Sequence, residues 1–224
     1  MIDLKHFVQS HGFQVAHIKT DSIKIPNATP EIIELVMEFG QNYGYEFEHE
    51  ATYEKFCLVN DAVYIAYVKA AKKPAHWTAV GAQFQQPVVF KTLFSHEPFI
   101  FRDFCETKLV TTAMYLDFSE VDTPMAFLEE DYLSDIGMHF VGKAGLFTPI
   151  MPGHGGALLM REKEGKYYAV GGTKNYEWME SEMVDVLDYK DYIDKSYYDK
   201  QVNDALEKIS QFGDFERFIT VNER

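Results

Sequence analysis

An acidic residue between two short strands is the feature of this chain whose type and position could do chemistry. Residues 13–18 and 23–25 alternate apolar and polar side chains, which predicts two strands, and the polar break between them predicts a hairpin turn. The break reads Lys19-Thr20-Asp21-Ser22. A carboxylate at the tip of a hairpin is held rigidly and offers magnesium the hard oxygen ligand that this ion prefers. Asp21 is therefore a candidate metal ligand.

The same turn has a second interpretation that involves no metal. Asp and Ser side chains are frequent in surface turns, where they hydrogen-bond to backbone amides of the turn itself. The residue types in the turn do not separate these two interpretations, so the elements around the turn have to be considered.

The elements after the hairpin are predicted from capping residues and periodicity. Thr29 is a suitable N-cap, Pro30 suits the first helical position, and the apolar residues that follow repeat at helical spacing. Strands are predicted at 45–49 and 56–68, the second interrupted by a turn at residues 60–61. The first third of the chain therefore reads as hairpin, helix and hairpin.

The rest of the chain mixes helices with short strands. A helix is predicted at residues 3–10, and Ser196 with Asp199 resembles a capping box that starts another helix. Glycines punctuate residues 140–170, which predicts tight β-hairpins there. Helices combined with antiparallel hairpins predict an α+β fold.

The candidate hairpin resembles motif C of B-family DNA polymerases, whose pattern is Tyr-x-Asp-Thr-Asp-Ser between two palm strands. The stretch reads Val15-Ala16-His17-Ile18-Lys19-Thr20-Asp21-Ser22-Ile23-Lys24-Ile25. Asp21 falls on the second aspartate of the pattern, which in the family is the principal magnesium ligand. Lys19 replaces the first aspartate, and the resemblance leaves it either a phosphate contact or an ion-pair partner of Asp21. Thr20 and Ser22 are implied to support contacts to nucleotide or primer.

A second stretch is similar to the family's Lys-x-Tyr strand, which contacts the primer. It reads Leu58-Val59-Asn60-Asp61-Ala62-Val63-Tyr64-Ile65-Ala66. Tyr64 matches the tyrosine, whereas Ala62 stands where the family has lysine. Lys69, Lys72 and Lys73 follow closely and could supply the phosphate contacts instead.

A further surface is ambiguous between DNA binding and a bland alternative. Residues 166–168 and 171–174, with Lys174, could track DNA by combining cations with aromatic stacking. An exposed hairpin edge with partly buried tyrosines explains the same residues equally well.

The resemblance covers most of the chain and implies the C-terminal part of a phage-type B-family polymerase. Residues 1–95 would be the C-terminal half of the palm, and residues 96–224 the thumb with a C-terminal extension. The implied reaction is the transfer of a deoxynucleoside monophosphate from a dNTP onto a primer 3′-hydroxyl on primer-template DNA, with Mg²⁺ as cofactor.

Motif A, with the other essential aspartate, and motif B, with its nucleotide-binding lysine, do not occur in this sequence. We therefore expect no activity in isolation and a partner polypeptide that carries both motifs and completes the two-metal site. A split enzyme, a gene remnant and an arbitrary fragment all remain open as origins.

The composition predicts a folded protein of the cytoplasm, or of the host cytoplasm if the chain is phage-encoded. Its apolar fraction of 46% suits a packed core, and neither a signal peptide nor a long apolar span is present in the sequence. Cys57 and Cys105 are too few for a disulfide framework or a zinc cluster, so free thiols are predicted.

The formal charge of −14 opposes DNA phosphates at long range. It favours a rival function, that of a stand-alone acidic protein that binds another protein, in a regulatory way or by imitating DNA. Local lysines, and not the net charge, make phosphate contacts, so the polymerase interpretation is also compatible with this composition.

Overall fold

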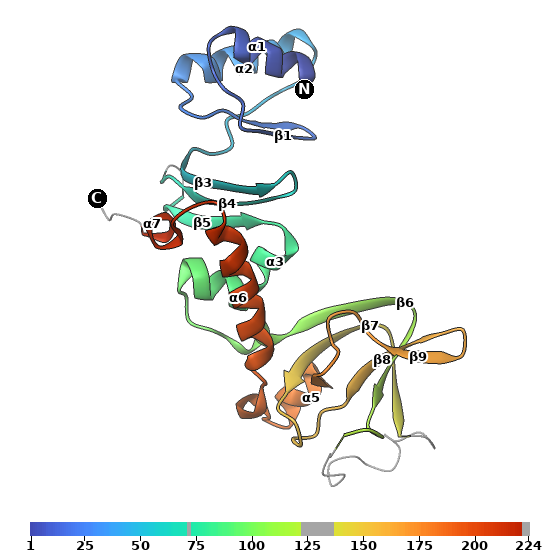
Figure 1. Cartoon of the computed structure of the whole chain (residues 1–224). Helices are drawn as coiled ribbons and strands as arrows, with labels where there is room; N and C mark the ends of the chain where they lie inside the picture. Colours follow the sequence, from blue (N-terminus) through green and yellow to red (C-terminus); the bar gives the residue numbers. More distant parts are fainter. Residues whose placement is uncertain (71–72, 122–136, 221–224) are drawn as a thin grey trace. The chain divides into compact units, whose positions relative to one another are not determined.

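The structure is a computed structural model that describes residues 1–70, 73–121 and 137–220. It is an α+β chain whose sheets are all antiparallel (Figure 1). Contacts within the chain group it into two units, one of residues 1–85 with 206–224 and the other of residues 86–205. The assignment of 1–95 to a palm and 96–224 to a thumb stays a prediction.

The first unit begins as the sequence predicts, with a helix, a hairpin and a second helix. These are α1 (Ile2–Ser10), β1 (His17–Lys19), β2 (Ser22–Lys24) and α2 (Pro30–Asn42). Thr29 is the N-cap of α2, and its hydroxyl accepts from the Ile32 backbone N–H at 3.5 Å. The two helices and the hairpin pack around Leu4, Val8 and Val36, so the hairpin is part of this small apolar core.

A three-stranded meander follows in the same unit. Its strands are β3 (Tyr53–Asn60), β4 (Val63–Val68) and β5 (His76–Val80), with β4 in the centre. The predicted turn between β3 and β4 is confirmed. The helices that complete the unit are α3 (Ala82–Gln85), the end of α6 (Ser196–Ser210) and α7 (Phe215–Ile219).

The strand predicted at 45–49 is wrong, because residues 45–52 form no strand. Their alternation is real, but β3 pairs with β4 and the described sheet has no strand beyond β3. A segment without a pairing partner cannot form a ladder, whatever its pattern.

The second unit is built on a five-stranded sheet in the order β10-β7-β6-β8-β9. Its strands are β6 (Glu106–Asp117), β7 (Met138–Ile150), β8 (Leu158–Lys163), β9 (Lys166–Ala169) and β10 (Glu177–Glu180). Its helical segments are α4 (Pro87–Phe90), the π-helix η1 (Lys91–Ser95), the 3-10 helices η2 (Phe101–Phe104) and η5 (Lys190–Tyr192), α5 (Ser181–Val186) and the start of α6.

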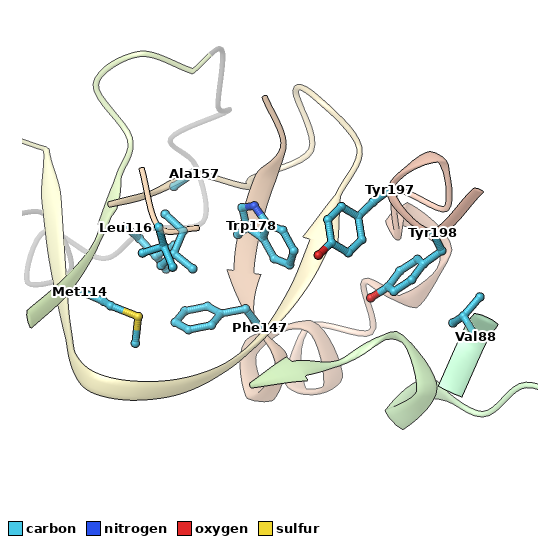
Figure 2. Close-up of a cluster of buried hydrophobic side chains, with 10 residues drawn as sticks. Val88, Met114, Leu116, Phe147, Ala157, Trp178, Tyr197 and Tyr198 are labelled. Carbon is cyan, nitrogen blue, oxygen red and sulfur yellow. The ribbon is translucent and has the colours of Figure 1, made fainter. Parts of the chain in front are cut away.

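Aromatic side chains dominate the core of this sheet. Trp178, Phe147 and the two tyrosines at the start of α6 line up along it, with Met114 and Leu116 at one end (Figure 2). Trp178 is fully buried, and its indole N–H donates to the Thr173 carbonyl at 3.1 Å. The core therefore joins the beginning of α6 to the sheet.

The prediction that the glycines between 140 and 170 lie in hairpin turns is only partly right. Gly153, Gly155 and Gly165 lie in turns, but Gly142 and Gly145 lie inside the 13-residue strand β7. Gly142 has φ +116° at a shift of register between β6 and β7, and a Cβ on Gly145 would come within 2.6 Å of the Phe147 ring. These glycines serve a bent and crowded strand, not a turn.

Two smaller expectations are also answered. Ser196 does start α6, yet the carboxylate that accepts its backbone N–H, at 3.0 Å, belongs to Asp194 and not to a residue inside the helix. Cys57 and Cys105 are free thiols, and burial raises the pKa of Cys57. Among the described residues, no helix combines the length and the apolar character needed to cross a membrane.

Candidate functional site

Asp21 lies in a two-residue turn, as the sequence predicts. Lys19 pairs with Ser22, so Thr20 and Asp21 alone connect β1 to β2. Thr20 adopts φ +43°, a region that β-branched residues rarely occupy, and the Ser22 hydroxyl donates to the Lys19 carbonyl at 3.3 Å. The turn is tight, and the Asp21 side chain is exposed at its tip.

Lys19 is exposed beside this turn. Within the part of the chain that the structure describes, no ion pair joins it to Asp21. The phosphate contact that the resemblance implies for Lys19 stays a prediction.

The Asp21 turn lies at the edge of a groove of about 690 Å³ in the first unit. The groove is bounded by β2, by α2 and by the strandless segment 45–52. Its acidic lining residues are Asp21, Glu46, Glu48 and Glu50. Lys24 and His49 also line the groove. The four carboxylates suit a cation or the positively charged part of a ligand, and the Lys24 ammonium suits a phosphate.

The groove does not by itself form a metal centre. Across residues 1–70, 73–121 and 137–220, no group of three or more His, Cys, Asp or Glu side chains is arranged to hold an ion. Asp21 offers one hard oxygen ligand in a rigid position, which fits magnesium in chemistry but not in number. Further ligands would have to come from another chain or from substrate.

The hairpin that carries Asp21 packs against the strand that carries Tyr64. His17 and Lys24 are directly opposed in the β1–β2 ladder, so their side chains share one face. The Lys24 ammonium lies 5.6 Å from the Tyr53 ring centre and 5.8 Å from that of Tyr64. Cation–π contacts at these distances join the β1–β2 hairpin to the strands that carry Tyr53 and Tyr64.

Tyr64 belongs to an aromatic cluster on the meander. Its ring centre lies 5.1 Å from that of Phe56 and 6.4 Å from that of Tyr53. Burial raises the pKa of Tyr53 far above its ordinary value, and the neighbouring Tyr64 phenol raises it further through its charge and a hydrogen bond. The Tyr53 phenol therefore stays a neutral hydrogen-bonding group at physiological pH.

His17 connects the β1–β2 hairpin to the turn before the Tyr64 strand. Its Nε2 donates to the Asp61 carbonyl at 2.9 Å, in the turn between β3 and β4. The ring is buried, with 7% of its surface exposed, and within the described residues its Nδ1 has no hydrogen-bond partner. Ala62, which stands where the Lys-x-Tyr pattern has lysine, lies in this same turn and not in the strand.

The predicted DNA-binding lysines belong to both units. Lys69 and Lys73 are exposed in the first unit, and Lys174 is exposed in the second. Lys72 lies outside the described residues. These lysines remain predicted phosphate contacts.

Sequence reasoning missed three residues of this site: His17, Lys24 and Tyr53. A signal for two of them was available, since a two-residue turn fixes the register and places His17 opposite Lys24. Tyr53 could not be found in this way, because its place depends on how the meander packs on the hairpin.

Comparisons with family models, with characterised proteins and with solved structures find no match to this chain. The site must therefore be interpreted from its own residues and from the motif resemblance.

Proposed function

We propose that this chain is the C-terminal portion of a B-family DNA-directed DNA polymerase. It supplies Asp21 as one magnesium ligand and a primer-contacting surface around Tyr64. The proposal depends on one observation above all: Lys24, three residues after Asp21 on the same hairpin, lies over the rings of both Tyr53 and Tyr64.

Polymerase chemistry requires this proximity. The bond between the primer 3′-oxygen and the α-phosphorus forms while the bond to pyrophosphate breaks, and both oxygens must lie at the metal ions. A metal ligand and a primer contact must then be neighbours. The two stretches that resemble the metal-binding and primer-contacting motifs lie in the same unit of this chain, with 43 positions between Asp21 and Tyr64 (64 − 21). This shared unit supports the proposal.

Each residue of the site has a role that its chemistry allows. Asp21 presents a carboxylate oxygen to a cation, and bound magnesium would activate the 3′-hydroxyl and stabilise the leaving pyrophosphate. Lys24 can neutralise a primer phosphate, and the Tyr64 hydroxyl can donate a hydrogen bond to it. His17, through its hydrogen bond to Asp61, fixes the position of the hairpin relative to the β3–β4 turn.

The chain is incomplete for this reaction. A single carboxylate cannot hold two metal ions, so the second acid must come from a polypeptide that carries motifs A and B. The β1–β2 sheet has only two strands in the described chain, which is marginal in isolation, and its outer edges have no neighbouring strand there. Such edges suit completion by a partner.

The test is primer extension with magnesium and dNTPs. This chain is mixed with a polypeptide that carries polymerase motifs A and B, and the mixture is compared with each component alone. We expect extension only in the mixture, and none with Asp21→Ala or Asp21→Asn. Asp204→Ala, an exposed acid on α6, is the matched control and keeps full activity.

Other outcomes overturn the proposal. Extension that survives Asp21→Asn excludes Asp21 as a metal ligand. A stable complex that never extends a primer, under any magnesium concentration, excludes a working polymerase subunit and favours the acidic binding protein.

A further inference from the structure

The β8–β9 hairpin of the second unit combines cations with an exposed aromatic ring. Arg161 is paired with Tyr168, and Lys163 with Lys166, in its antiparallel ladder. Opposed residues share a face, and residues two apart on a strand share it too. All four side chains therefore lie on one face of the hairpin, and all four are exposed.

Along the sheet, this face changes from buried apolar residues to exposed residues at Arg161. Leu159, two residues before Arg161 on the same face, is 1% exposed, and the partner of Arg161 on β6 is the fully buried Met114. Past Arg161 the apolar residues stop and the cations begin. The hairpin leaves the body of the sheet at its free edge, where β9 is the last strand (Figure 1).

The opposite face of the hairpin differs in chemistry. There Tyr167 stands edge-on to Tyr115 at 5.3 Å, and Tyr115 stands edge-on to Phe140 at 5.5 Å. These rings support one another, and Tyr167 is 37% exposed. Tyr168, on the cationic face, is 48% exposed, which leaves a ring surface open for stacking.

Two glutamates lie close to the cations, but neither shares their face in the ladder. Glu162 is opposed to Tyr167 on the other face, and its Oε1 accepts from the Gly165 backbone N–H at 2.6 Å. Glu164 is in the turn, with φ +55°. Within a Debye length of ~10 Å, Glu164 weakens the attraction of the tip for anions without cancelling it.

We propose that this face of the β8–β9 hairpin binds a single-stranded nucleic acid. Arg161, Lys163 and Lys166 contact successive phosphates, and one base stacks on Tyr168. Cations that follow a backbone beside an aromatic ring that accepts any base are the pattern of sequence-tolerant single-strand binding. The site is separate from Asp21 and does not rest on the proposed polymerase function.

The arrangement favours a nucleic acid over an acidic peptide. The carboxylates of an acidic peptide would pair with the three cations but would not stack on the exposed ring of Tyr168. A duplex offers phosphates but keeps its bases stacked inside, so it too would gain nothing from that ring. The contribution of Tyr168 is therefore the decisive measurement.

The experiment measures the fluorescence anisotropy of a labelled oligothymidylate titrated with the full chain, over a series of salt concentrations. We expect Tyr168→Leu to weaken binding at least fivefold, since loss of stacking is large. Tyr167→Leu, a neighbouring tyrosine on the other face, is the matched control and changes binding less than twofold. Circular dichroism confirms that each variant folds.

The lysines are tested in the same assay. The double variant Lys163→Gln with Lys166→Gln should reduce the slope of log affinity against log salt by about 1.4, since each single-strand phosphate contact contributes about 0.7. Lys195→Gln with Lys200→Gln changes the charge equally elsewhere in this unit and leaves the slope as it was. Glu164→Gln should tighten binding.

Three results would overturn the proposal. One is no binding at low salt. Another is equal loss with Tyr167→Leu and Tyr168→Leu, or no loss with Tyr168→Leu, which would leave a purely electrostatic patch. The third is equal affinity for polyglutamate and oligothymidylate, which would identify an acidic protein segment as the ligand.

Discussion

His17 donates a hydrogen bond from Nε2 to the carbonyl oxygen of Asp61 over 2.9 Å, although 44 residues separate the two in sequence. The bond joins the hairpin that carries Asp21 to the turn that precedes Tyr64. Because the imidazole is buried, the bond is shielded from water, and its loss would leave the Asp61 carbonyl unsatisfied beside a cavity. Together with Lys24, which lies over the Tyr53 and Tyr64 rings, His17 thus fixes the position of the Asp21 hairpin relative to the strand of Tyr64.

Replacing this histidine should destabilise the first unit. We expect His17→Ala to lower the free energy of unfolding by about 1–3 kcal/mol, from the lost hydrogen bond and the cavity. Urea unfolding followed by Trp77 emission in a Trp178→Phe background reports on this unit alone, because the chain has two tryptophans, one in each unit. His6→Ala, at an exposed site on α1, should stay within about 0.5 kcal/mol of the parent. Equal stability of the two variants would contradict the role of His17.

The proposed primer-contacting surface gives a kinetic prediction for the proposed polymerase, reconstituted with a polypeptide that carries motifs A and B. Tyr64→Leu and Lys24→Met should each raise KM for primer-template about tenfold, which is 1.4 kcal/mol of binding, with little change in kcat. Asp21→Ala should instead abolish kcat. Steady-state extension at varied primer-template concentration separates the two, with Lys5→Met on α1 as control. A fall in kcat with KM unchanged for Lys24→Met would argue against a primer contact.

The local elements of the site could be predicted from the sequence because local rules determine them. Thr29 and Pro30 mark the start of α2, and the polar break at Asp21 marks a turn whose length fixes the β1–β2 register. The α+β class follows from the same signals. These features depend on residues within a few positions of one another.

The predictions that were wrong concern segments whose structure depends on pairing with residues distant in sequence. Residues 45–52 alternate like a strand, but the described sheet holds no strand for them to pair with. Gly142 and Gly145 resemble turn residues, but pairing with β6 holds them inside β7. The contact between His17 and Asp61 was equally hidden, since no pattern in one segment states which surface it will meet.

A lysine provides another such contact, at the C-terminal end of α7. Lys55 on β3 donates from Nζ to the carbonyls of Arg217 at 3.1 Å and Phe218 at 2.8 Å, and also to that of Thr220. The last carbonyls of a helix are unpaired and carry partial negative charge, so a cation satisfies them well. The Phe218 ring lies 5.4 Å from that of Trp77, so α7 is packed on the meander.

Removal of this ammonium should loosen α7 without unfolding the unit. We expect Lys55→Met to lower the stability of the first unit by about 1–2 kcal/mol and to speed amide exchange of residues 215–219. Exchange followed by mass spectrometry, together with Trp77 emission, checks both effects, and Lys5→Met is the control. Unchanged exchange in α7 would show that packing against Trp77 alone holds the helix.

Two buried tyrosines at the start of α6 predict how the second unit responds to alkaline pH. The Tyr197 hydroxyl donates to Glu106 Oε2 at 2.9 Å, and the Tyr198 hydroxyl donates to the Phe104 carbonyl at 2.6 Å. Burial first, and then the neighbouring Glu106 carboxylate, raise the pKa of both phenols above the ordinary value of 10.0. Both therefore stay neutral in the folded protein when the unfolded chain has begun to ionise.

The sign of the pH dependence follows from linkage. A group whose pKa is raised by folding stabilises the fold fully below its unfolded pKa, and this contribution is lost as pH rises through that value and beyond. The free energy of unfolding of the second unit should thus be constant up to about pH 9 and then fall by up to about 1.4 kcal/mol per pH unit for each tyrosine. Tyr197→Phe should halve the slope, at a cost of about 1 kcal/mol at neutral pH from the lost hydrogen bond. Urea unfolding by Trp178 emission in a Trp77→Phe background measures both, with the exposed Tyr168→Phe as control. If Tyr197→Phe and Tyr168→Phe gave the same slope, the Tyr197 phenol would ionise in the folded unit as freely as in the unfolded chain, contrary to its burial against Glu106.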